Sequence, residues 1–194
     1  MNLRALPIFP TIIVVIAAAI MVALGFWQLG RLEEKEALIA QYANAARDQG
    51  SIPLPTTVEG RRANLYRPAT AICDRVLERE VVGGRNRLGT IGWVQLVKCT
   101  DPDGVEFDAA IGWTAQPAVA AYDGGPINGR IGGAGDGTRL ISGGMEDGMM
   151  MVPPPDPNDL PNNHLAYAGQ WFFFALTALV IYFLAIRKRL REGA

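Results

Sequence analysis

Two long stretches of uncharged, apolar residues constrain this chain more than any other feature. The first is Thr11–Leu29 (TIIVVIAAAIMVALGFWQL) and the second is Leu165–Ile186 (LAYAGQWFFFALTALVIYFLAI). A helix rises 1.5 Å per residue, so about 20 apolar residues cross a hydrocarbon layer of roughly 30 Å. The sequence therefore predicts a transmembrane helix near each end, with about 135 residues between them.

The first stretch also has features of a secretory signal peptide, because it follows Arg4 near the N-terminus. Three observations favour a membrane span instead. Signal sequences usually have a shorter apolar core, and no small-x-small cleavage motif follows directly. Trp27 lies at the far end, where aromatic residues anchor spans at the interface. A charged helical segment comes next.

Basic residues at the ends of the spans predict the topology. Arg187–Arg191 (RKRLR) follows the second span and indicates a cytoplasmic C-terminus. Arg31 and Lys35 after the first span favour the opposite orientation, but more weakly, and we give weight to the C-terminal cluster. Both termini are then cytoplasmic and the central domain is exported. Since the N-terminus carries no long Arg- and Ser-rich transit sequence, we expect a bacterial inner membrane protein with a periplasmic domain.

The exported segment shows short strand-like runs separated by turns. An amphipathic helix is predicted over Arg31–Arg47, and Gly-rich residues 121–137 are predicted to form a long loop. Met151–Asn163 is a stiff, Pro-rich approach to the second span. The predicted strands are Arg67–Cys73, Arg75–Val82, Leu88–Lys98, Glu106–Trp113 and Arg139–Ser142.

These features predict two transmembrane α-helices flanking a mainly antiparallel β periplasmic domain with one N-terminal amphipathic helix. Short strands with frequent turns favour a small barrel or sandwich for that domain. The expected division is 1–30 for the first span and 31–163 for the β-rich domain with its Pro-rich linker. Residues 164–194 then form the second span and a basic cytoplasmic tail.

Composition excludes several classes of function. The 18 basic and 19 acidic residues give a net charge of −1, so nothing suggests a nucleic-acid partner. One histidine excludes any site that needs two imidazoles from one chain. The chain has no GxSxG, HExxH, P-loop or EF-hand spacing, which disfavours an enzyme.

Two cysteines, Cys73 and Cys99, lie in the exported segment, where disulfides persist. A disulfide and two separate buried thiols remain open alternatives from the sequence. A copper site formed by the pair is less favoured, because there is no CxxC spacing.

Two clusters of polar and aromatic residues remain, and the topology brings them to the same leaflet. The cluster after the first span contains Gln28, Arg31 and Lys35, at helical spacings of three and seven. The cluster at the start of the second span contains His164, Tyr167, Ala168 and Trp171.

Small residues such as Ala175 and Ala178 continue the second cluster along the span, followed by Tyr182. Such a stripe lets a flat ring or a partner helix approach closely. The alternative is that Arg31 and Lys35 snorkel and that His164 merely caps a helix.

Both clusters belong to longer patterns. The first reads Gly25-x-Trp27-Gln28-x-x-Arg31-x-x-x-Lys35-x-x-Leu38-Ile39, and the second Asn162-Asn163-His164-Leu165-x-Tyr167-Ala168-x-x-Trp171-Phe172. Together they resemble the two terminal signatures of the surfeit-locus cytochrome oxidase assembly proteins. Gly92-Trp93 and Gly112-Trp113 resemble that family's middle blocks. Ala110-Ile111 depart from it, because Asn-Arg usually stands there.

The resemblance implies a non-enzymatic assembly factor for haem-copper, aa3-type cytochrome c oxidase that assists haem a delivery to subunit I. It ties His164 to haem binding, as the ligand of the haem iron. We add the inference that Arg31 and Lys35 lie near the haem propionates. The candidate cofactor-binding residues are His164, Tyr167, Trp171, Gln28, Arg31 and Lys35.

The implied partners are oxidase subunit I, other oxidase subunits or assembly factors, the haem a synthesis machinery and the lipid bilayer. One alternative function is a purely structural protein that braces subunit I. A third is copper handling through thioethers, which suit Cu(I). Its candidate ligands are Met145, Met149, Met150 and Met151.

Overall fold

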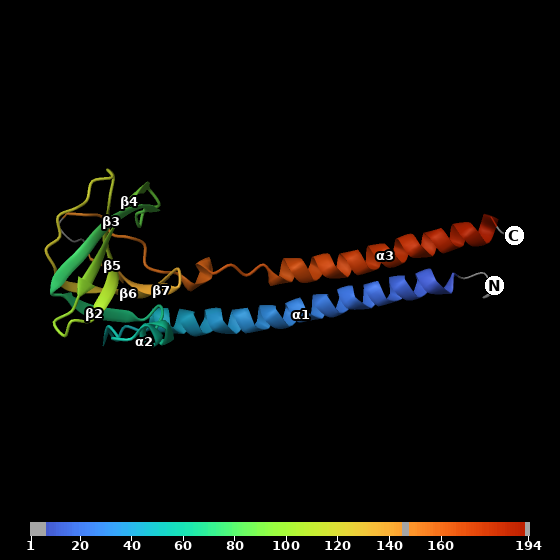
Figure 1. The fold of residues 1–194 in the computed structure, drawn as a ribbon, viewed down its shortest axis with the longest axis horizontal. Coiled ribbons are helices and arrows are strands. Elements are labelled where there is room, and N and C mark those ends of the chain that lie inside the picture. The colour runs from blue at the N-terminus through green and yellow to red at the C-terminus, as the bar shows by residue number, and fades with distance from the viewer. Residues whose placement is uncertain (1–6, 145–147, 193–194) are drawn as a thin grey trace. The chain divides into compact units, whose positions relative to one another are not determined.

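The computed structural model describes residues 7–144 and 148–192 of the chain (Figure 1). It separates into two compact units. One unit extends to Leu38 and resumes at Pro161, and the second comprises Ile39–Leu160. The helices of the first unit and the sheet of the second are described in turn.

The first helix, α1 (Ile8–Arg47), is one uninterrupted helix of 40 residues. The predicted first span and the predicted amphipathic helix are therefore parts of a single element about 60 Å long. Gly30 lies near the junction, where nothing is packed within 4 Å of the position a Cβ would take. One exposed glycine costs a helix only about 1 kcal/mol, so the helix continues through it.

The last helix, α3 (His164–Glu192), lies alongside α1 (Figure 1). The residues that are buried on the two helices are small. Ala18 and Gly25 are the buried residues of α1, and Ala168 and Ala175 are those of α3. A Cβ on Gly25 would lie 2.4 Å from a ring carbon of Phe172, so only glycine allows this approach. Small residues at such a seam are typical of paired membrane helices.

The other faces of both helices stay apolar and uncovered. Only 11% of the most apolar window of α1, and 6% of that of the second helix, is buried within the structure. Both helices are long and apolar enough to cross a membrane. A water-soluble domain rarely exposes so much apolar surface, so the exposure favours lipid as the surroundings.

Two polar contacts fix the register of this antiparallel pair. Near one end the hydroxyls of Thr11 and Tyr182 share a short hydrogen bond. Near the other end Nδ1 of His164 lies 2.8 Å from Oε1 of Gln28. Seventeen residues separate the two contacts on α1 and eighteen on α3, which is about 26 Å along each helix. The polar contacts thus bracket a layer close to the thickness of a bilayer's hydrocarbon core.

The second unit is built on a seven-stranded sheet with the order β1-β2-β6-β7-β5-β4-β3. Four of the neighbouring pairs are antiparallel, while β1·β2 and β5·β7 are parallel, so the sheet is mixed. The short helices are α2 (Val58–Ala63) and the 3-10 helix η2 (Pro157–Asp159). The strands are β1 (Ile52–Pro53), β2 (Pro68–Cys73), β3 (Arg75–Arg85), β4 (Ile91–Thr100), β5 (Glu106–Thr114), β6 (Gly125–Ala134) and β7 (Gly137–Ser142).

The sheet curls back on itself. β2 and β3 are separated along the chain by Asp74 alone, yet β2 pairs with β6 and β3 pairs with β4. Cys73 and Cys99 join β2 to β4 through a disulfide, with their Cα atoms 5.3 Å apart. In a flat sheet four strand spacings would hold these strands about 19 Å apart. The finer prediction of a barrel or a sandwich goes beyond these pairings and stays a prediction.

One predicted loop is wrong. The five predicted strands correspond to β2, β3, β4, β5 and β7, but residues 125–134 of the Gly-rich segment form β6. Ile127 and Ile131 point into the core and are fully buried, with Gly129 between them on the same face. A Cβ on Gly129 would lie 2.1 Å from the carbonyl oxygen of Ile141. Gly129 interrupts the alternation of apolar residues that would have predicted a strand. It is nevertheless required here, because a side chain would collide with the backbone of β7.

Tyr66 connects three parts of the second unit. Its backbone is in the left-handed region (φ 69°), its carbonyl accepts a hydrogen bond from Arg130, and its ring lies 4.8 Å from that of Tyr42 on α1. Burial, followed by Tyr42 and the carboxylates Asp156 and Asp159, raises the pKa of the Tyr66 phenol. The end of α1 and the approach to α3 thus meet at one buried side chain.

The disulfide should stabilise the second unit. Replacing both Cys73 and Cys99 by alanine should lower the free energy of unfolding by about 3–4 kcal/mol, because the crosslink closes a loop with a sequence separation of 26. Chemical denaturation of the full chain in detergent, followed by tryptophan fluorescence, measures this change. An unchanged denaturation midpoint would contradict a structural role.

The seam between α1 and α3 can be tested with two glycines. Gly25→Leu should destabilise the helix pair by about 1–3 kcal/mol, because its side chain collides with Phe172. Gly30→Ala is the matched control, since its Cβ meets nothing and helix propensity improves by about 0.5–1 kcal/mol. Thermal unfolding in detergent should shift in opposite directions. Equal shifts in the two variants would refute the close packing.

Candidate functional site

His164 is the first residue of α3, and its side chain is directed to the other span. The carbonyl of Asn163 accepts a hydrogen bond from the backbone N–H of Tyr167, which places Asn163 at the start of the helix. The imidazole is half-buried, and its Nδ1 meets Oε1 of Gln28, 2.8 Å away. His164 therefore joins two helices in the structure, and the Gln28 contact takes the ring nitrogen that a cap would use.

The partner of Nδ1 determines which nitrogen of His164 is free. A carbonyl oxygen only accepts hydrogen bonds, so Nδ1 must carry the proton that it donates to Gln28. A neutral imidazole protonated on Nδ1 has its lone pair on Nε2. Gln28 thereby holds the tautomer and the ring orientation that a metal ligand needs.

The Nε2 atom of His164 is accessible. Among the described residues it makes no hydrogen bond, and it is not one of the buried atoms that lack a partner. An accessible ring nitrogen on an imidazole that Gln28 holds in place fits an axial ligand of haem iron. The donor set is therefore compatible with haem.

The aromatic residues of the predicted site have different surroundings. Tyr167 is 51% exposed, while Trp171 is half-buried and lies edge-to-face with Phe174 at 6.3 Å. Ala168 is 1% exposed because it packs in the seam with α1. Of the two uses expected for the stripe of small residues, the approach of a helix is the one seen, with α1 as that helix.

The two basic residues of the predicted site have different surroundings. Arg31 is about half exposed and forms an ion pair with Glu34, one turn further along α1. Lys35 is half-buried, seven residues beyond Gln28 on the same side of the helix, and has no ion pair among the residues described. The structure thus brings His164 and Gln28 into contact. Of the two cations, Arg31 has an acidic partner, whereas Lys35 has none among the described residues.

Two interacting residues were missed from the sequence. Glu34 is the partner of Arg31, and its position three residues along a helix was a signal for this pair. Thr11 bonds Tyr182 at the opposite end of the spans. A hydroxyl at the end of each apolar stretch was the only sequence signal for that contact.

The two Gly-Trp pairs of the middle of the chain pack together on β4 and β5. A Cβ on Gly92 would lie 2.2 Å from the indole of Trp113, so the glycine makes room for that ring. Indole Nε1 of Trp113 donates to the carbonyl of Gly84 at 3.4 Å.

The departure from the family pattern at Ala110-Ile111 coincides with a bulge. Leu96 pairs with Ala110 and Gln95 with Gly112, so Ile111 is the extra residue. Both Ala110 and Ile111 are buried in apolar clusters on the sheet. At these positions the chain therefore carries core residues.

The three candidate methionines that lie within the described residues have different surroundings. Met149 is buried, whereas the sulfurs of Met150 and Met151 accept hydrogen bonds from Asn86 and Arg87 respectively. Met145 lies outside the described residues. Within the ranges described, no group of three His, Cys, Asp or Glu side chains is placed to hold a metal ion.

Two apolar helices of spanning length flank a mixed-sheet domain, and a histidine of one contacts the other. This arrangement is compatible with the class of membrane proteins that have two spans. The chain belongs to the SURF1 family, whose model matches residues 15–176. This family is linked to cytochrome oxidase assembly, and it is a family of assembly factors. A search of curated proteins finds no match.

The tautomer of His164 can be measured directly, because it is the only histidine in the chain. In protein labelled with ¹⁵N-histidine at neutral pH, Nδ1 should give the signal of a protonated nitrogen and Nε2 that of an unprotonated one. Gln28→Leu should convert this into a mixture of tautomers, whereas Tyr182→Phe at the other contact should not. A wild-type ring protonated on Nε2 would refute the assignment.

Proposed function

We propose that the chain assists haem a delivery to, or insertion into, subunit I of a haem-copper cytochrome c oxidase. Membership of the SURF1 family supports the link to the oxidase. The single observation that carries the haem assignment is the contact of His164 with Gln28, because it leaves Nε2 free and oriented. Haem a, when bound, supplies an iron that takes a neutral imidazole as an axial ligand.

Three of the remaining site residues have separate proposed tasks. Lys35 is a half-buried cation without an ion-pair partner among the described residues, and it attracts the propionates. Arg31 contributes less, since Glu34 already compensates it and solvent screens an exposed pair. Tyr167 offers an exposed ring beside His164. The farnesyl tail of haem a is suited to the apolar lipid that surrounds the spans.

The proposed location is a bacterial inner membrane, with both termini cytoplasmic and the sheet domain in the periplasm. The basic cluster after Ile186 supports this orientation. The proposed partners are subunit I, other subunits or assembly factors of the oxidase, and the haem a synthesis machinery. The chain acts by holding and orienting its cargo, so we propose no catalytic residue.

Haem retention should depend on His164. In protein purified from cells that make haem a, His164→Ala should remove at least nine tenths of the Soret absorbance, because the iron loses its ligand. Gln28→Leu should weaken haem retention severalfold, because the His164 ring loses the hydrogen bond that holds its tautomer and orientation. Arg31→Ala should weaken haem retention less. Absorption spectra at equal protein concentration measure all three.

Tyr182→Phe is the matched control, since it also removes a polar contact between the spans but lies at the opposite end. It should retain haem as the wild type does. If His164→Ala keeps a full Soret band and full oxidase activity, the histidine is only a contact between the helices. Haem would then be held elsewhere on the chain. Wild-type protein that carries neither a Soret band nor copper would instead support the alternative of a purely structural brace for subunit I.

A further inference from the structure

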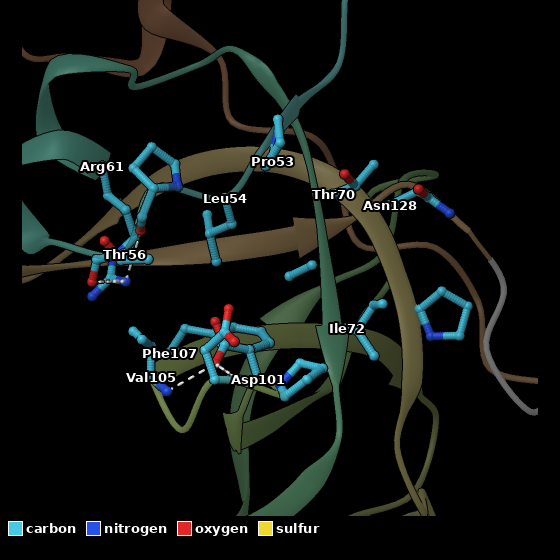
Figure 2. A pocket seen from close by; sticks show the side chains of 15 residues that line it. Pro53, Leu54, Thr56, Arg61, Thr70, Ile72, Asp101, Val105, Phe107 and Asn128 are labelled. Carbon is cyan, nitrogen blue, oxygen red and sulfur yellow. Dashed lines mark hydrogen bonds between the residues drawn. The ribbon is translucent and has the colours of Figure 1, made fainter.

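A cavity of about 420 Å³ lies in the sheet domain, and none of the residues predicted to bind haem lines it. It is bounded by β1, β2 and the turn between β4 and β5, and its volume is in the range typical of small-molecule sites. Leu54, Ile72 and Phe107 supply apolar walls (Figure 2). Arg61 of α2 lines the same cavity.

Arg61 is an unusual buried cation. Its residue exposure is 8%, and every partner of its guanidinium among the described residues is neutral. Nε donates to the hydroxyl of Thr138 at 3.1 Å, and Nη1 donates to the carbonyls of Pro55 and Thr56 at 3.1 and 3.2 Å. No carboxylate of the described chain lies within 4 Å of it. Burial of an unpaired charge is costly, so a site for an anion is the natural explanation.

The second terminal nitrogen of Arg61, Nη2, is unused. It makes no hydrogen bond with the described residues, and it is not among the atoms sealed from solvent without a partner. Nη2 therefore keeps some accessible surface, and Arg61 is one of the residues that line the cavity. A planar guanidinium held by three hydrogen bonds presents its remaining donors to a carboxylate without further ordering.

Two acidic residues, Asp101 and Asp103, also line the cavity. Oδ1 of Asp101 accepts hydrogen bonds from the backbone of Asp103 at 2.9 Å and of Val105 at 2.8 Å (Figure 2). It thus holds the turn between β4 and β5 and does not compensate Arg61. Neither Asp101 nor Asp103 forms an ion pair with Arg61, so the guanidinium has no carboxylate partner among the described residues.

We propose that this cavity binds a small apolar monocarboxylate, with its carboxylate on Arg61 and its apolar body against Leu54 and Phe107. An extended peptide added to the edge of the sheet fits less well. Pro53 ends β1 and Pro55 follows shortly, and proline has no N–H for such pairing. The cavity therefore suits a compact ligand.

The test uses the full chain in lipid nanodiscs and three probes that share one apolar body: 4-phenylbutyrate, 4-phenylbutanol and 4-phenylbutylamine. Binding is measured by saturation-transfer NMR, with empty nanodiscs as the background. Phenylbutyrate should bind at least tenfold more tightly than the alcohol, and the amine should bind most weakly. Equal binding of the three probes, or no binding of phenylbutyrate, would overturn the proposal without any variant.

Variants locate the site. Arg61→Gln should weaken phenylbutyrate binding at least tenfold, and Arg61→Lys should restore part of it by keeping the charge. Arg62→Gln is the matched control, because Arg62 is the exposed neighbour and bonds the carbonyl of Asp136 outside the cavity. If Arg62→Gln weakens binding as much as Arg61→Gln, the carboxylate is bound elsewhere and the proposal fails.

Discussion

The antiparallel pairing of α1 and α3 determines where the polar groups of the helical unit lie. The ring of Phe172 packs against Gly25, and the contacts at Thr11 and Gln28 set the register of the two helices. Hydrogen bonds between membrane helices contribute only about 0.6 kcal/mol on average, so packing of the small residues supplies most of the association. The polar contacts instead select one register among several that packing alone would allow.

The same register gives His164 two compatible roles. Its Nδ1 serves the helix pair through Gln28, and its Nε2 is left for a ligand. A structural and a ligand role need not compete, since the imidazole has two nitrogens and the first bond fixes the state of the second. The modest energy of the contact also means that Gln28 can be replaced without unfolding the spans. The effect of the tautomer on haem can therefore be measured separately from stability.

The sequence was sufficient for the features that depend on local pattern. Uninterrupted apolar length predicts both spans, and alternation with turn residues predicts five of the strands. β6 was missed because Gly129 interrupts its alternation, and its requirement for glycine comes from Ile141 on the neighbouring strand. The contact of Gln28 with His164 depends on how each helix is rotated about its axis. A helical spacing of three or seven residues shows which side chains share a face, but not which way that face is turned. Nothing in the sequence indicated that Arg61 would be buried. Its side chain becomes buried only when α2 packs over β7.

The central claim is that Gln28 prepares Nε2 of His164 for an iron. Haem a added to protein labelled with ¹⁵N-histidine in nanodiscs tests it most directly, because the chain contributes a single imidazole. The account predicts that the Nε2 signal is lost or strongly shifted as haem binds, while Nδ1 keeps its proton and its bond to Gln28. Two unchanged nitrogen signals in the presence of bound haem, or loss of the Nδ1 proton, would contradict it.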